Sequence, residues 1–248
     1  MAKQIFHHLF SWRTLKRIFS DFWPPLLLLT IVFILGFLNY QPGTRLTGWD
    51  NLHPEYNFDL NFKNAIFSVW QEKGTGFLAG MSFAAELPRI IFLFFISQIL
   101  FIKFQMLRYL WTFFALGLGA VSTYFLLHHI FLKPKFDPQT KRIASFLGAL
   151  FYLLNLATVQ YFFTTFETFT GFFAFFPLIF LATTLYFERA SSKRYLLLIA
   201  VLLFSSPPFL IQTLFVVTSL CLVPIFISHL RHSWKKILVF SLTLFATQ

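Results

Sequence analysis

Residues 22–40 read FWPPLLLLTIVFILGFLNY and contain no charged side chain. A helix that crosses the hydrocarbon core of a bilayer needs about 20 mainly apolar residues. Pro24 and Pro25 stand at the start of this run, where proline is tolerated in a helix. The preceding basic residues are Lys3, Arg13, Lys16 and Arg17. Because positive charge is retained on the inner side of a membrane, this order predicts an uncleaved anchor with a cytoplasmic N-terminus.

The composition extends the membrane interpretation to the whole chain. Of its 248 residues, 57% are hydrophobic and 12% charged, with a mean hydropathy of +0.70. Soluble domains carry about 25% charged residues. A net charge of +11 would suggest nucleic acid in a soluble protein, but here the basic residues lie in short runs between apolar segments. We therefore expect the lipid bilayer, and not nucleic acid, as a partner.

Further apolar stretches follow, and the distribution of lysine and arginine orients them. The stretches are 109–131, 143–162, 171–186 and 195–228. The last is too long for one helix and has two prolines toward its middle (Pro207 and Pro208), which predicts a helical hairpin. Between Arg89 and Lys103 lie only 13 uncharged residues, a short run for a span. If this run does not cross, 14 of the 20 basic residues fall inside, so the positive-inside rule favours that arrangement.

We therefore expect an all-α protein, a polytopic transmembrane helical bundle with amphipathic interfacial helices in its first outer loop. It would be a multi-pass protein of the cell membrane. One domain covers 1–248, with the first span at 22–40, the outer loop at 41–105 and further spans at 109–248. The last apolar segment, from Ile237, has about 12 residues, too few to cross, so we expect an incomplete domain truncated at the C-terminus.

The outer loop holds most of the polar chemistry, since residues 41–89 carry five of the nine acidic residues. Apolar residues recur there with helical spacing, which predicts an amphipathic helix at the membrane surface up to Glu72. They are Phe62, Ile66, Val69 and Trp70. Asp59 is the predicted N-cap and Gly74 the predicted stop. A second short helix is predicted at 77–86, before Pro88.

Three segments of this loop resemble a known enzyme family. They read GWDNLHPE at 48–55, AIFSVWQE at 65–72 and AAELPR at 84–89, and GALFYLLNLATVQ at 148–160 fits the same pattern. Together with one span before a large outer loop, they are similar to the N-terminal region of bacterial alpha-(1->3)-arabinofuranosyltransferase-like membrane proteins of the GT-C superfamily. The bundle is accordingly expected to be GT-C-like.

The resemblance implies a membrane glycosyltransferase. It would move a sugar, with arabinofuranose as the candidate, from a polyprenyl-phosphate donor to a cell-envelope glycan acceptor on the outer side. By position, Asp50 is the implied general base, which takes the proton of the attacking hydroxyl. An Asx turn in the turn-like run at 48–51 is the structural alternative. Some enzymes of this superfamily use a divalent cation, but no adjacent acid pair indicates one, so we predict no cofactor and no metal site.

Six further residues are candidates for substrate binding. They are Arg45, His53, Glu55, Glu86, Arg89 and Glu167. The two arginines bracket the loop and would either hold the donor phosphate or anchor the chain at lipid headgroups. His53 and Glu55 lie close to Asp50 in the sequence. The other two acids stand beside apolar outer stretches, where a carboxylate is costly and a functional role is the default hypothesis.

Two other functions remain open. A transporter or flippase for lipid-linked sugars would carry charges or broken helices near the bilayer midplane. The spans are poor in charge, which favours the enzyme, although Pro207 and Pro208 would suit a transporter too. The chain could also be an inactive N-terminal fragment or a non-catalytic membrane subunit.

The topology predicts which positions react with a membrane-impermeant thiol reagent on intact cells. In a Cys221→Ser background, Asp50→Cys should be labelled and Pro138→Cys should be protected. Labelling at both positions would mean that 89–103 crosses the membrane. Protection at 50 with labelling at 138 would place the loop inside and contradict the glycosyltransferase hypothesis.

Overall fold

The computed structural model describes residues 12–47, 53–67, 70–71, 77–78, 80–131 and 136–247. This part of the chain is helical apart from one short ribbon, which confirms the all-α class. The helices are α2 (Trp12–Asn39), the 3-10 turn η1 (Pro54–Tyr56), α3 (Phe58–Phe67), α4 (Gly80–Leu100), α5 (Phe104–Phe131), α6 (Pro138–Leu154), α7 (Leu156–Phe163), α8 (Glu167–Glu188), α9 (Ser192–Phe204), α10 (Ser206–Phe209) and α11 (Gln212–Thr247). The ribbon pairs β1 (Trp70–Gln71) with β2 (Phe77–Leu78).

Several helices could cross a membrane, as the sequence predicts. In the described residues, four are long and apolar enough, and the bent pair α6 and α7 makes a fifth if it counts as one span. The four windows are Phe22–Asn39, Phe104–Ile130, Glu167–Glu188 and Gln212–His229. Helices of this length and composition are consistent with a multi-pass membrane protein. The first arm of the predicted hairpin is shorter than expected, because 13 residues of α9 rise only about 20 Å.

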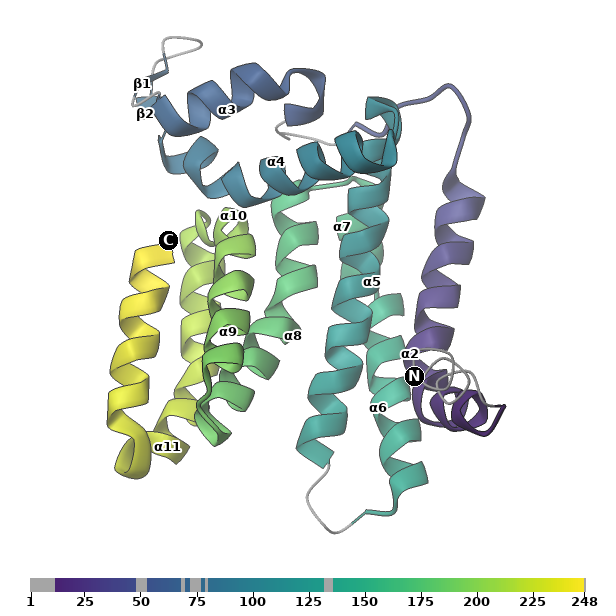
Figure 1. Ribbon diagram of the computed structural model, residues 1–248, viewed down its shortest axis with the longest axis vertical. Coiled ribbons are helices and arrows are strands. Elements are labelled where there is room, and N and C mark those ends of the chain that lie inside the picture. Colours follow the sequence, from purple (N-terminus) through teal and green to yellow (C-terminus); the bar gives the residue numbers. More distant parts are fainter. Residues whose placement is uncertain are drawn as a thin grey trace, which may run out of the picture.

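The helices form two layers that cross at a steep angle. Figure 1 shows α2, α5, α6, α8, α9 and α11 standing roughly parallel, with α3 and α4 lying across one end of them. We call α3 and α4 the cap. The segment 89–103, predicted not to span, belongs mainly to α4 and therefore lies across the bundle instead of within it.

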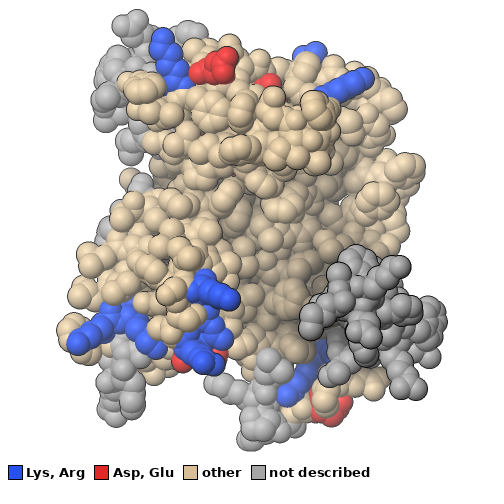
Figure 2. Space-filling view, in the orientation of Figure 1, with Lys and Arg blue, Asp and Glu red and all other residues tan. Residues whose placement is uncertain are grey.

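Charge is segregated toward the two ends of the molecule. On the face shown in Figure 2, blue lysines and arginines gather at the end opposite the cap, and the broad belt between the ends is free of charged side chains. Basic residues at that end come from the first turns of α6 and α9 and from the turn of α11, including Lys141, Lys193 and Lys236. A charge-free belt is what the hydrocarbon core of a bilayer demands.

Helix α11 doubles back on itself opposite the cap. Phe226 and Phe240 have ring centroids 5.2 Å apart. In a straight helix, 14 residues would separate them by about 21 Å. The chain after the turn runs back beside α9, where Tyr195 and Thr243 share a hydrogen bond of 2.9 Å between their hydroxyls. Figure 1 shows this return in yellow.

The structure corrects the predicted elements of the outer loop. The amphipathic helix ends at Phe67, and residues 70–71 lie in β1 instead. Asp59 is not its N-cap, because the side chain of Asn57 accepts the hydrogen bond from the Leu60 amide, at 2.9 Å. The predicted stop, Gly74, lies outside the described residues.

The second predicted helix is also wrong in its limits. Residues 77–78 form β2, and α4 begins at Gly80 and continues through Pro88 to Leu100. Proline removes a helical hydrogen bond and crowds the preceding turn. Ser206 on α10 donates a hydrogen bond of 2.8 Å to the Ala85 carbonyl in that turn, which ties α4 to the bundle where the proline weakens the helix.

The centre of the bundle is the contact between α5 and α8. Gly119 of α5 faces Phe173 of α8 so closely that a Cβ on the glycine would lie 2.3 Å from the phenylalanine ring. Tyr152 on α6 stacks on the same ring at 4.3 Å between centroids and donates a hydrogen bond of 2.9 Å to the Phe173 carbonyl. Three helices therefore meet on Phe173.

This contact predicts a stability difference between two glycines that are two residues apart on α5. Gly119→Ala should lower the free energy of unfolding by about 1–3 kcal/mol, because the added methyl group overlaps a ring that is itself stacked. Gly117→Ala is the matched control, since its Cβ would meet only Leu29 and Val32 at 3.4 Å or more. Thermal unfolding in detergent measures both. Equal melting temperatures for the two variants would contradict the packing.

Candidate functional site

A buried ionic cluster joins the cap to the bundle. It consists of Glu55, Glu86, Arg89, Arg108 and Glu167, and we call it the ion cluster. Glu55 comes from η1, Glu86 and Arg89 from α4, Arg108 from the first turns of α5, and Glu167 is the first residue of α8. Their side chains are between 3% and 15% exposed. Four segments distant in sequence are thus held by charge at one point.

Arg108 is at the centre of this cluster. Its Nε donates to Oε1 of Glu55 at 2.8 Å, and its Nη2 lies 3.5 Å from Oε2 of the same carboxylate. Its Nη1 donates to Oε1 of Glu167 at 2.9 Å. Arg89 donates to that same oxygen and, through Nε, to Glu86. Glu167 is therefore shared by both guanidinium groups.

The environment shifts the pKa values of the two acids Glu55 and Glu86 of the ion cluster in opposite directions. Burial by itself would raise the pKa of Glu55, but hydrogen bonding and the charge of Arg108 outweigh it and hold that pKa below its usual range. Burial raises the pKa of Glu86, and the nearby Glu167 carboxylate adds to this against the opposing charge of Arg89. Burial opposes the charge of Arg89, yet Glu167 and Glu86 raise its pKa and keep it ionised.

The structure brings together five of the six residues predicted to bind substrate. Glu55, Glu86, Arg89 and Glu167 belong to the ion cluster. His53 lies at its edge, with Nδ1 at 3.3 Å from Oε1 of Glu55 and its ring 5.4 Å from that of Tyr56. In this arrangement the cluster's charges contact one another. Asp50, the predicted base, lies outside the described residues.

Arg108 is the residue that the sequence analysis missed as a candidate for the site. The sequence predicts for it only a place among the basic residues on the outer side. A usable signal was present, because Arg108 directly precedes the apolar run at 109–131 and so lies at the end of a span. A buried charge there needs a partner, and Glu55 and Glu167 are acids expected on the same outer side.

The sixth predicted residue, Arg45, lies apart from the ion cluster. Its side chain is exposed, and its guanidinium carbon lies 5.0 Å from the centre of the Phe104 ring and 5.7 Å from that of Tyr56. Because Tyr56 directly follows Glu55, the ion cluster fixes one of the two rings that hold Arg45. Cation–π contacts of this kind orient an arginine without neutralising it.

Arg45 lines a small polar pocket of about 280 Å³ beside the ends of α2 and α5. We call this pocket the mouth. Its lining residues are Asn39, Tyr40, Gln41, Thr44, Arg45, Leu46, Gln105 and Tyr109. Arg45 is its one charged side chain among the described residues.

A largely apolar cavity of about 400 Å³ adjoins the mouth, and we call it the first cavity. It lies between α2, α5, α6 and α7 and shares Asn39, Leu46 and Tyr109 with the mouth. The chain bends by 45° at Asn155, between α6 and α7, which carries Val159 and Phe163 of α7 to the cavity wall. The Asn155 side chain stabilises this bend by accepting a hydrogen bond from the Thr158 amide at 3.1 Å.

Neither a metal site nor a relative is found. Among the described residues, no group of three or more His, Cys, Asp or Glu side chains is arranged to hold a metal ion. The chain matches no protein-family model, no curated protein sequence and no solved structure. The resemblance to GT-C enzymes therefore depends on the quoted motifs alone.

The burial of Arg108 predicts a large cost for its removal. Arg108→Gln should lower the free energy of unfolding by about 3–5 kcal/mol, because Glu55 would remain buried without its main cation. Glu55→Gln with Arg108→Met should recover part of this loss, since Arg89 still holds Glu167. The matched control is His129→Gln, which breaks the more exposed pair with Glu188 and should cost about 1 kcal/mol or less. Thermal unfolding in detergent measures all three, and equal losses for Arg108→Gln and the control would contradict the cluster's role.

The lowered pKa of Glu55 also predicts a pH dependence. A carboxyl whose folded pKa lies below its ordinary value contributes stability above that ordinary value, and the contribution is lost as pH falls through the folded pKa. The melting-temperature difference between the native chain and Glu55→Gln should therefore be large near neutral pH and shrink as the pH falls below the ordinary pKa of a glutamate. A difference that grows on acidification would show the opposite sign and contradict the ion pairing.

Proposed function

We propose that this protein is a membrane glycosyltransferase of the GT-C type. It takes a sugar, with arabinofuranose as the candidate, from a polyprenyl-phosphate donor and transfers it to a cell-envelope glycan. The cap faces the outer side of the cell membrane, and the N-terminus is cytoplasmic. The family assignment comes from the motifs at 48–55, 65–72 and 84–89.

The observation that carries the proposal is the apolar first cavity that ends at a polar mouth with one cation. A polyprenyl phosphate has the same division, since a long hydrocarbon chain ends in a phosphate. The chain would lie between α2 and α7, where Leu153, Val159 and Phe163 line the wall. The phosphate would reach Arg45, which can donate two parallel hydrogen bonds to phosphate oxygens.

The proposed reaction is a single displacement. An acceptor hydroxyl oxygen forms a bond to the anomeric carbon as the bond from that carbon to the phosphate oxygen breaks, which inverts the configuration. Asp50 takes the hydroxyl proton, and the polyprenyl phosphate leaves with the bonding electron pair. Arg45 stabilises the charge that grows on the leaving phosphate.

The ion cluster has a supporting part in this proposal. Its charges contact one another within the protein, so its residues hold the cap and the Tyr56 ring in place while Arg45 lies at the mouth. In this proposal the cluster positions the cap and does not bind the substrate. Its members among the predicted substrate-binding residues are Glu55, Glu86, Arg89 and Glu167.

Transfer assays with a polyprenyl-phosphate sugar donor test the proposal. Asp50→Asn should lower kcat by about 10²–10⁴, because the acceptor hydroxyl loses its general base. Asp59→Asn is the matched control, since it makes the same change on an exposed acid of the same loop and should leave kcat unchanged. Arg45→Gln should weaken donor binding and slow transfer. If Asp50→Asn and Asp59→Asn have equal activity, Asp50 is not the base. If the native chain moves the intact lipid-linked sugar across vesicles without transfer, it is a transporter.

A further inference from the structure

A second apolar cavity lies on the other side of the contact between α2 and α5. Its volume is about 460 Å³, and we call it the second cavity. Its walls include Val32 and Phe33 of α2 and Met106 and Leu110 of α5. The tyrosine hydroxyls of its lining are the polar side-chain groups there, whereas the first cavity includes Asn39, Thr112 and Thr158.

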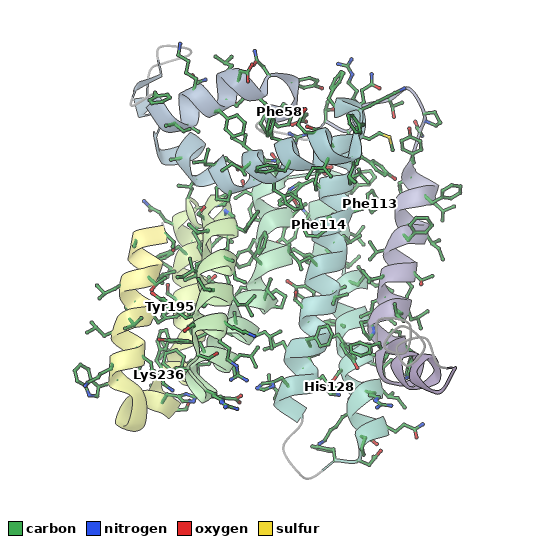
Figure 3. The ribbon with its side chains drawn as sticks, in the orientation of Figure 1. Phe58, Phe113, Phe114, His128, Tyr195 and Lys236 are labelled. Carbon is green, nitrogen blue, oxygen red and sulfur yellow. The ribbon has the colours of Figure 1, made fainter. Side chains whose placement is uncertain are left out.

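A partition separates the two cavities. The Tyr109 hydroxyl donates a hydrogen bond to the Gly36 carbonyl, which joins α5 to α2. Gly36 lies so close to Phe113 that a Cβ would be 3.3 Å from the ring. Tyr109 and Phe113 line both cavities, and Figure 3 shows Phe113 on the side of α5 that faces α2. A chain in one cavity is therefore kept apart from a chain in the other by a wall of side chains.

Both cavities border the same mouth. Tyr109 lines all three spaces, Tyr40 lines the mouth and the second cavity, and Asn39 lines the mouth and the first cavity. The second cavity also shares Leu110 and Phe114 with an apolar pocket of about 290 Å³ lined by α4 and α5. Two hydrocarbon chains would thus approach one polar junction from opposite sides of Tyr109.

From this geometry we infer that the acceptor is a glycolipid with an uncharged head, whose hydrocarbon chain occupies the second cavity. The inference depends on the proposed function, because the first cavity and Arg45 are assigned to the donor. Arg45 is the one cation in the described lining of the mouth, and a single cation matches one phosphate. The second amphiphile must therefore present a neutral group at the mouth, and a glycan hydroxyl is the group that glycosyl transfer consumes.

The chemistry balances with this second substrate. The glycolipid hydroxyl oxygen gains the bond to the anomeric carbon, its proton goes to Asp50, and the donor's phosphate leaves with the electron pair. The product is the same glycolipid extended by one sugar. It stays in the second cavity while the spent polyprenyl phosphate leaves the first.

Photo-crosslinking on the full chain in phosphatidylcholine vesicles tests the assignment with two probes. One is farnesyl phosphate and the other dodecyl glucoside, each with a diazirine on its hydrocarbon chain. The glucoside should label residues of the second cavity such as Phe33, and the phosphate should label residues of the first such as Phe163.

Two matched variants fill one cavity each. Met106→Trp should reduce glucoside labelling at Phe33 by about tenfold and leave phosphate labelling at Phe163 within about twofold. Val159→Trp should do the reverse. Both positions lie on the cavity walls and are at least partly exposed, so the larger side chain can be accommodated without disrupting the core.

Three results would overturn the second site. They are displacement of the glucoside from Phe33 by unlabelled farnesyl phosphate, labelling that is unchanged in Met106→Trp, and equal labelling by dodecanol with the same diazirine. The first result would mean that both probes share one site. The other two would mean that the second cavity holds bulk lipid. Failure of the proposed function is distinct, because farnesyl phosphate would then label nothing around Val159 in the native chain.

Discussion

The pairing of Arg108 with Glu55 and Glu167 is the interaction on which the arrangement of the cap depends. A buried guanidinium loses its hydration, so it is stable only where carboxylates replace the water. Glu55 and Glu167 supply those carboxylates from widely separated parts of the sequence, and both lie at the cap end of the bundle. If either acid were moved away, a charge would remain buried without its partner. The cost of that state fixes η1, α4, α5 and α8 relative to one another.

The position of the cap also determines which side chains are exposed at its edge. Tyr56 follows Glu55, and Phe104 precedes Arg108 by one helical turn, so both rings are held by residues of the ion cluster. Arg45 lies over these two rings and stays exposed at the mouth. Within the cap, Phe94 of α4 receives the rings of Phe58 and Phe62 from α3, each at 5.5 Å between centroids. Figure 3 shows Phe58 in this layer. Buried ion pairs and aromatic packing thus hold in place the two rings over which the exposed Arg45 lies.

The sequence could predict what depends on long apolar runs, and it failed where tertiary contacts decide. The runs at 22–40 and 109–131 correspond to α2 and α5, because a span needs little more than length and apolarity. The helix expected up to Glu72 ends at Phe67, since helical spacing over so few residues does not exclude a ribbon. The sequence predicts a helix boundary at Pro88, yet α4 passes through it and Ser206 of α10 contacts the same turn. No local sequence pattern predicts that contact, because its two residues are 121 positions apart in the sequence.

For the candidate site, too, the sequence predicts which residues matter but not which residues they contact. The rule that acids near a membrane are functional selects Glu86 and Glu167, but it does not distinguish a substrate ligand from a structural partner. That distinction depends on whether a charge is already matched. Four of the selected residues are joined in one cluster with Arg108, whereas Arg45 lies over two aromatic rings and faces a pocket. An arginine that is oriented by π faces keeps its N–H donors for an anion. Arg45 is therefore a better candidate than the acids for the group that binds the substrate.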